Sequence, residues 1–330
     1  MRTILLIASV KERYYYDAFL KAAESRGLKV FVFDQNSLIE GASFSLAMNE
    51  FGHLTGFIDV LKMSDECDTV VRLDIRDIQV AWYVREGSSQ QNHDQSLETR
   101  FKRNETRQAI LSLMSVLDCV WINRAETIDS INSNKFFQQR IAAQCGLAVP
   151  STVMTNYPPA VYGESRKKDG LLFKSIGYIT LSREKNYYLY SECFSHQELL
   201  EHEVAIANCP VYAQHYVEKR YEYRVMAIGN RVLSCRIDSQ ASEKTKIDWR
   251  HYDFDNVGHV QVSLPNEVEE KILYFMRTIG LRYGAIDLIE SPEGDFVFLE
   301  VNPSGQWGWI ADLAGLSIAE AVADMLETAT

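Results

Sequence analysis

The fold is best predicted from the stretch Tyr283-Gly-Ala-Ile-Asp-Leu-Ile-Glu-Ser-Pro-Glu-Gly-Asp-Phe-Val-Phe-Leu-Glu-Val-Asn-Pro-Ser304. Two apolar runs flank a Pro-Glu-Gly turn, a pattern typical of a β-hairpin. If the turn is centred between Glu293 and Gly294, Asp287 lies directly opposite Glu300. Because side chains alternate along a strand, Asn302 shares their face and lies one step further from the turn. The hairpin therefore predicts a cluster of three oxygen-bearing side chains.

Two carboxylates on neighbouring strands repel each other, so something must offset the charge of Asp287 and Glu300. Mg²⁺ does so well, since it binds one or two protein carboxylates and completes its shell with water and substrate phosphates. The alternative is a solvated hairpin with ordinary surface acids. Both carboxylates interrupt apolar strands, Ala-Ile-Asp-Leu-Ile and Val-Phe-Leu-Glu-Val, which favours a nucleotide site.

Before the hairpin, the predicted secondary structure changes from an alternating α/β pattern to a mainly β pattern. Strand patterns at 4–10 and 29–33 enclose a helix pattern at 14–26, which predicts an α/β lobe with a parallel sheet. From Gly170 the pattern becomes β, with strands expected at 171–174, 186–191, 211–217, 223–229 and 231–237. Gly229-Asn230 is a hairpin-turn signal. Helices are expected at 265–280 and 317–326, on either side of the 284–301 hairpin.

The segment 87–107 is polar and lacks a hydrophobic stripe, which predicts an exposed loop before a helix at about 106–117. A short strand at 120–123 precedes a helix that contains Phe136 and Ile141 and ends at Gly146.

Composition limits the class of protein. Hydrophobic residues make up 46% and charged residues 24% of the 330, which is ordinary globular usage. No stretch approaches the ~20 apolar residues of a membrane span, so we expect no membrane partner and a cytoplasmic location. The net charge of −11 disfavours nucleic acid and favours a small molecule or peptide. The six cysteines form no zinc or disulfide pattern. A homodimer is the default for soluble oligomers.

Asp287 followed by Glu300-Val-Asn302-Pro resembles the metal-binding D…E-x-N signature of ATP-grasp ligases, and the resemblance covers about residues 120–330. It implies ATP and Mg²⁺ as cofactors, with Asp287, Glu300 and Asn302 as metal ligands. It also implies that two strand-associated lysines, Lys135 and Lys174, hold the ATP phosphates. The alternative for each lysine alone is a surface charge.

The implied fold is α/β, with α+β character in the C-terminal part. It comprises a pre-ATP-grasp α/β domain at 1–125, a small or central lobe at 126–212 and a C-terminal lobe at 213–330 with the metal-binding hairpin.

The stretch Val211-Tyr-Ala-Gln-His-Tyr-Val-Glu-Lys219 resembles the hinge strand of that family. Backbone groups near Val217 would bind adenine, with Gln214 and Glu218 as candidates beside it. Glu222 is the candidate for the ribose hydroxyls. The alternative is a core strand with polar ends.

Three stretches resemble a narrower family, the maturases that make microviridin-type graspetides. They are Gln79-Val-Ala-Trp-Tyr-Val-Arg85 with Trp121-Ile-Asn-Arg124, Ile237-Asp-Ser-Gln240 with Asp248-Trp-Arg250, and Glu300-Val-Asn-Pro-Ser-Gly-Gln-Trp307. Such enzymes join Asp or Glu side chains of a ribosomal precursor peptide to Ser or Thr as esters, or to Lys as amides. Val84-Arg85-Glu86 departs from the paired arginine and proline that many relatives have at this position.

Arginines before the hairpin are candidates for binding a substrate carboxylate or acyl phosphate, because guanidinium groups bind carboxylates in two-point fashion. They are Arg224, Arg236 and Arg250, and Arg236 is the first choice. Its alternative is an exposed strand arginine whose stem packs on the sheet. Asp248 is a candidate to orient the nucleophile or to accept its proton, and the alternative is a structural loop clasp.

Two other functions compete with a peptide macrocyclase. One is an ATP-grasp ligase that acts on free amino acids or short peptides, and the other is a nucleotide-binding regulator without turnover. A leader-guided enzyme should carry a groove for a helical peptide, which we place near residues 194–204, and the peptide's core should be acidic. An intact metal triad argues against the regulator.

Overall fold

The computed structural model describes residues 2–63, 67–84, 96–132, 134–168, 170–177, 180–181, 187–188 and 190–329. The chain forms two compact units, which are described separately. The first comprises Met1–Glu126 with Ser317–Thr330, and the second comprises Thr127–Leu316.

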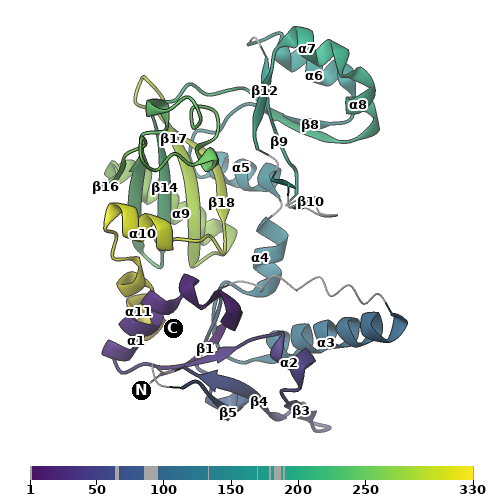
Figure 1. Cartoon of the computed structure of the whole chain (residues 1–330), viewed down its shortest axis with the longest axis vertical. Helices are drawn as coiled ribbons and strands as arrows, with labels where there is room; N and C mark the ends of the chain where they lie inside the picture. Colours follow the sequence, from purple (N-terminus) through teal and green to yellow (C-terminus); the bar gives the residue numbers. More distant parts are fainter. Residues whose placement is uncertain are drawn as a thin grey trace. The chain divides into compact units, whose positions relative to one another are not determined.

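The first unit is built on a mixed sheet with the strand order β3-β4-β2-β1-β6-β7, in which β5 pairs with β4 (Figure 1). Its four parallel strands are β1 (Thr3–Ile7), β2 (Lys29–Phe33), β6 (Val80–Tyr83) and β7 (Val120–Ile122). An antiparallel extension contains β3 (Phe44–Met48), β4 (Leu54–Lys62) and β5 (Thr69–Asp74). The α/β prediction for this part of the chain is confirmed.

Helices of the first unit include η1 (Val10–Tyr15), α1 (Asp17–Ser25), α2 (Ser37–Glu40), η2 (Ile75–Asp77), α3 (Leu97–Val116) and α11 (Ile318–Thr328). The helix α11 packs against α1, and Arg26 Nη2 lies 2.9 Å from Asp324 Oδ1. The sequence division assigned 317–330 to the C-terminal lobe, but the structure groups these residues with the N-terminal unit because Val322 and Leu326 of α11 are buried there.

Helix α3 corrects the loop prediction for residues 87–107. It begins at Leu97, after Ser96 accepts a hydrogen bond from the Thr99 amide as an N-cap. Its first turns are exposed, so they have no hydrophobic stripe to reveal them in the sequence. The remainder of the predicted loop, through residue 95, lies outside the described residues.

The second unit contains a four-stranded antiparallel sheet with the order β12-β9-β13-β8. These strands are β8 (Thr152–Thr155), β9 (Leu171–Lys174), β12 (Glu192–Phe194) and β13 (Val211–Gln214). Figure 1 shows α6 (Pro158–Ser165), α7 (His196–Glu201) and α8 (Glu203–Asn208) against this sheet. Val161, Leu199 and Ala213 belong to the core between them. A separate strand pair joins β10 (Thr180–Leu181) to β11 (Tyr187–Tyr188).

The same unit contains a five-stranded antiparallel sheet with the order β16-β15-β14-β17-β18. These strands are β14 (Tyr221–Ile228), β15 (Arg231–Ile237), β16 (His259–Val262), β17 (Tyr283–Glu290) and β18 (Phe296–Asn302). The remaining helices are α4 (Ala125–Asn132), α5 (Lys135–Gln144), η3 (Ser239–Ala241), η4 (Trp249–His251), α9 (Asn266–Ile279) and α10 (Gly308–Ala314). Ala142 of α5 and Phe275 of α9 pack with Phe298 of β18 in the core on one face, which leaves the other face for polar side chains.

Among the helices that the structure describes, none combines the length and the apolar character that crossing a membrane requires.

Candidate active site

The hairpin of β17 and β18 places Asp287 directly opposite Glu300, as the sequence predicts. Nearer the turn the register changes, because Leu288 pairs with Phe298 and leaves Leu299 as a β-bulge. The turn is thus centred half a residue earlier than expected, and the bulge restores the predicted pairing at the carboxylates. A bulge beside a site is a common way to aim side chains.

Each of the two carboxylates lies next to a different positively charged side chain. Arg224 Nη1 donates to Asp287 Oδ1 at 3.0 Å, and Lys135 Nζ lies 3.3 Å from Glu300 Oε2. Burial raises the pKa of Asp287, against the opposing effect of Arg224. Burial also acts on Glu300, but the charges of Lys135 and Lys174 outweigh it and lower the pKa of Glu300 to about 2. Glu300 is therefore an anion at neutral pH.

The two predicted lysines reach the same pocket from different elements. Lys174 ends β9, whereas Lys135 is the first residue of α5, so its assignment to a strand is corrected. The cause is the N-cap Asn134, whose side chain accepts from the Phe137 amide and starts the helix at Lys135. Burial lowers the pKa of Lys174, against the opposing effect of Glu300.

The predicted hinge strand ends earlier than expected, at Gln214, and residues 215–220 connect β13 to β14 without strand pairing. In this connection the amides of His215 and Arg220 donate to Ser151 and Glu290. The Val217 amide has no backbone acceptor among the described residues, so it is free to bind a ligand. Gln214 is buried and its amide donates to Thr152 and Tyr212.

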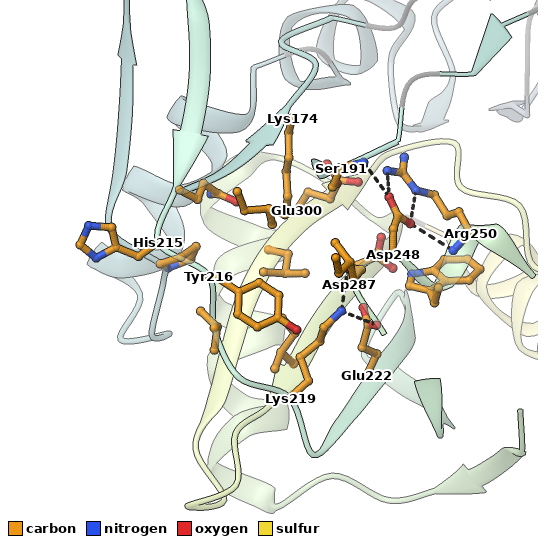
Figure 2. Close-up of a pocket in the computed structure, with 18 of the residues that line it drawn as sticks. Lys174, Ser191, His215, Tyr216, Lys219, Glu222, Asp248, Arg250, Asp287 and Glu300 are labelled. Carbon is orange, nitrogen blue, oxygen red and sulfur yellow. Dashed lines mark hydrogen bonds and ion pairs between the residues drawn. The ribbon is translucent and has the colours of Figure 1, made fainter. Parts of the chain in front are cut away.

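A buried ion pair lies below the hinge, as Figure 2 shows. Lys219 Nζ is 2.8 Å from Glu222 Oε1 and donates to the Ile247 carbonyl at 2.9 Å. Burial raises the pKa of Glu222, and Lys219 opposes this. Lys219 is not among the residues predicted from the sequence, although a lysine three residues before Glu222 favours an ion pair with it.

Asp248 and Arg250 form a clasp within one loop (Figure 2). Asp248 accepts from Arg250 Nε at 2.8 Å, from Arg250 Nη2 and from the Ser191 amide at 3.1 Å. Burial acts on Asp248, but its bonds with Arg250 prevail and hold its pKa far below the usual range. Of the two alternatives for Asp248, the geometry therefore matches the loop clasp, because so weak a base does not accept a proton at neutral pH.

The loop after β18 closes over Arg224. Arg224 Nη2 donates to the Gln306 carbonyl at 3.3 Å, and Tyr283 OH donates to the Gly305 carbonyl at 2.7 Å. A Cβ on Gly305 would lie 2.3 Å from Ala285 Cβ and 2.8 Å from Arg224 Nη2. Only glycine therefore allows this close approach.

Most of the predicted residues line one pocket of the second unit, which is partly open to solvent. They are Lys135, Lys174, Gln214, Val217, Glu222, Asp248, Arg250, Asp287 and Glu300. Residues that the sequence analysis did not assign to the site also line it, among them Ser191, Tyr216, Lys219 and Trp249.

Four predicted residues do not line the pocket. Arg224 donates a hydrogen bond to Asp287 without lining the pocket itself, and Glu218 is exposed. Asn302 pairs with Ala285 near the outer end of the hairpin, where its Oδ1 accepts from the Ser304 amide at 3.1 Å. Arg236 pairs with Tyr223 and lies over the Tyr221 ring at 4.4 Å.

The first choice among the arginines is therefore corrected. Strand alternation puts Arg236 on the face of Tyr221 and Tyr223, opposite the face of Arg224 and Asp287. Its guanidinium lies over the Tyr221 ring and does not line the pocket.

No protein-family model matches the chain, and no curated protein matches it. Solved structures do match over the full length. The Chryseobacterium gregarium RiPP-associated ATP-grasp ligase, in complex with ADP and a leader and core peptide, is 24% identical with a TM-score of 0.87, and the match covers 100% of this chain and 98% of that one. Macrocyclase MdnC from Microcystis aeruginosa MRC, bound with precursor peptide MdnA, is 22% identical with a TM-score of 0.82, covering 99% and 100%.

A more distant match is the ATP-grasp ligase PsnB with minimal precursor, Mg and ADP, at 17% identity and a TM-score of 0.73, covering 98% of this chain and 97% of that one. The chain therefore has the ATP-grasp fold, and the fold prediction is confirmed.

Proposed function

We propose that this protein is an ATP-dependent, ADP-forming ligase that activates carboxylates as acyl phosphates. The observation that carries the proposal is the pocket in which Lys135 and Lys174 face Glu300, with Asp287 on the adjacent strand. Two cations beside two carboxylates suit a ligand that brings both phosphates and a divalent metal.

The donor set fits Mg²⁺. Groups of three or more His, Cys, Asp or Glu suited to a metal are absent from the described residues. A site with only two carboxylates, Asp287 and Glu300, agrees with a cation that takes its other ligands from phosphate and water. Asn302 is proposed as a third ligand. Bound there, Mg²⁺ would neutralise charge on the transferring phosphoryl group.

The remaining nucleotide contacts come from the hinge. The unpaired amide of Val217 would bind adenine, with Gln214 and Glu218 beside it. Glu222, held by Lys219, would accept hydrogen bonds from the ribose hydroxyls. Lys135 and Lys174 would bind the phosphates.

In the first chemical step, a substrate carboxylate oxygen attacks the γ-phosphorus of ATP and ADP leaves. In the second, a hydroxyl or amine attacks the acyl carbon, phosphate leaves and the nucleophile loses its proton. Arg250 lines the pocket with a side chain 43% exposed, so it is the arginine best placed to bind the substrate carboxylate or acyl phosphate. Arg224 would orient Asp287, and Asp248 would orient Arg250.

We propose a ribosomal precursor peptide as the substrate, whose Asp or Glu side chains are joined to Ser or Thr as esters or to Lys as amides. Three of the matching structures named above contain a precursor or leader and core peptide. A leader groove near residues 194–204 is supported by the exposure of Leu200 and Val204, at 39% and 74%. A homodimer and an acidic core peptide remain predictions.

The alternative substrate is a free amino acid or short peptide. It is supported by a match to D-cycloserine synthetase DcsG, at a TM-score of 0.59 and 11% identity. Because this match is weaker than the matches to the peptide-bound ligases, a free amino acid or short peptide is the second candidate substrate.

The test is to co-express the protein with the short precursor encoded by a neighbouring reading frame and to measure the peptide's mass, since each ester or amide removes one water. We expect water loss together with ADP and phosphate. If AMP and pyrophosphate form, the acyl phosphate mechanism is wrong. If the precursor keeps its mass while free amino acids drive ADP formation, the alternative substrate is correct.

A further inference from the structure

Gln138, in the first turns of α5, makes three hydrogen bonds from a side chain that is 1% exposed. Its Nε2 donates to the carbonyls of Ile131 at 2.8 Å and Val301 at 3.1 Å. Its Oε1 accepts from the Val301 amide at 2.9 Å. One carboxamide thus satisfies both backbone groups of one residue of β18.

These bonds matter because β18 is the edge strand of its sheet. An edge strand presents unpaired N–H and C=O groups. Gln138 takes the place of a neighbouring strand at Val301, and further along β18 the Phe298 amide donates to the Ala148 carbonyl at 2.8 Å. The outer edge of β18 is therefore held in place from α5 and from the segment after it.

Val301 lies between Glu300 and Asn302, two of the proposed metal ligands. Gln138 lies three residues after Lys135, so both side chains emerge from the same face of α5. Lys135 Nζ lies 3.3 Å from Glu300 Oε2 and donates to the Ser175 carbonyl at 3.2 Å. Lys135 is thus linked to Glu300 through one turn of α5, the side-chain carboxamide of Gln138 and the backbone of Val301.

We propose that Gln138 is a positioning residue for the nucleotide site: it holds the phosphate-binding Lys135 and the metal-binding Glu300 in register. The inference rests on the proposed function. Gln138 does not line the pocket itself, so its effect on a ligand must pass through these two residues.

The experiment measures the Kd of Mg·ATP by titration calorimetry for wild type, Gln138→Met, Lys135→Met and the double variant. Methionine keeps the length of glutamine and removes its hydrogen bonds. We expect Gln138→Met, which removes all three hydrogen bonds, to weaken binding about tenfold, because part of their free energy holds the site in its binding geometry. We expect the loss of affinity in the double variant to be smaller than the sum of the losses in the two single variants. Additive losses would overturn the inference.

The control is Ala142→Gly, because Ala142 is buried on the same helix and makes no contact with the pocket. Glycine weakens the helix interior and removes one core methyl group, but it leaves the hydrogen bonds of Gln138 to Ile131 and Val301 in place. We expect this variant to lower the Tm and leave the Kd unchanged. A loss of affinity in proportion to the loss of Tm in both variants would make Gln138 merely structural and refute the proposal.

Gln138→Glu gives a second, independent arm if the methionine variant does not fold. An ionised carboxylate would face the carbonyls of Ile131 and Val301, whereas a protonated one can again donate to one of them. Relative to wild type at each pH, its affinity should recover as the pH is lowered from about 8 to about 6. If the ratio of the Kd of Gln138→Glu to the Kd of wild type does not change with pH, the inference is wrong.

The outcomes also separate the inference from the proposed function. If wild type itself fails to bind Mg·ATP, the proposed function is wrong. If wild type binds and Gln138→Met binds equally well, the function stands and the positioning role is wrong.

Discussion

At the scale of single residues, the two opposed carboxylates differ in their electrostatic surroundings. Asp287 contacts one arginine and is buried, so its pKa rises, whereas Glu300 lies near two lysines and its pKa falls to about 2. The two carboxyl groups therefore share one site, but their pKa values are shifted in opposite directions.

Glu300 should stabilise the fold at neutral pH. Its folded-state pKa of about 2 lies below its ordinary value of 4.5, so this contribution is present above about pH 4.5 and is lost as the pH falls toward 2. We expect Glu300→Gln to flatten the decline of the unfolding free energy across this window, as measured by urea unfolding at several pH values. If Glu300→Gln leaves this decline of the unfolding free energy with pH unchanged, the lowered pKa of Glu300 is wrong. Glu293→Gln in the exposed hairpin turn is the control.

Both carboxylates, Asp287 and Glu300, should also be essential for the reaction. Asp287→Ala and Glu300→Ala each remove a proposed metal ligand, so we expect ligation to fall below detection, a loss of at least about a thousandfold, while the protein stays folded. Circular dichroism checks the fold and ADP release checks the activity. Full activity in either variant at saturating ATP would mean that this hairpin is not the metal site.

At the scale of elements, the site depends on loops that pack against strands. The loop after β18 reaches over Arg224 only because residue 305 is glycine. In the same way, Lys219 ties the hinge to the carbonyl of Ile247 in another loop. Each contact can be broken by one substitution.

Gly305→Ala should displace the loop from Arg224. Its Cβ would lie 2.3 Å from Ala285 Cβ, and such overpacking costs about 2 kcal/mol of unfolding free energy. Activity should fall further than stability, because Arg224 holds Asp287. The matched control is Gly308→Ala, where no atom lies within 4 Å of the added carbon. Equal behaviour of the two variants in thermal unfolding would disprove the close approach.

Lys219→Met should leave the carboxylate of Glu222 buried without its cation, at a cost of about 3 kcal/mol. The double variant Lys219→Met with Glu222→Gln removes the stranded charge and should recover most of that stability. Chemical denaturation measures both. If the double variant is as unstable as the single one, the ion pair does not set the energetics of the hinge.

At the scale of the whole molecule, a net charge of −11 repels an acidic substrate. Screening weakens such repulsion, so raising the salt from about 20 to about 200 mM should increase kcat/KM for an acidic precursor roughly threefold at saturating ATP. A precursor with fewer acidic residues outside the joined positions should respond less. A fall for both precursors would indicate that local arginine contacts govern the encounter instead.

Local sequence patterns predicted the α/β character of the N-terminal unit and the β-hairpin that contains Asp287 and Glu300. Alternating apolar runs around a Pro-Glu-Gly turn are local signals, so the hairpin and the pairing of Asp287 with Glu300 could be read without a structure. The β15 strand and the Gly229-Asn230 turn were likewise local.

Which side chains reach the pocket depends on contacts between distant parts of the chain. The face of Arg236 follows from its partner strand, and the buried position of Lys219 follows from a loop nearly thirty residues away. The bond between Gln138 of α5 and Val301 of β18 likewise joins residues far apart in the sequence. Helix α11 joins the N-terminal unit because its apolar face packs against α1. Such contacts join residues far apart in the chain, and a local pattern contains no information about which distant surface will cover it.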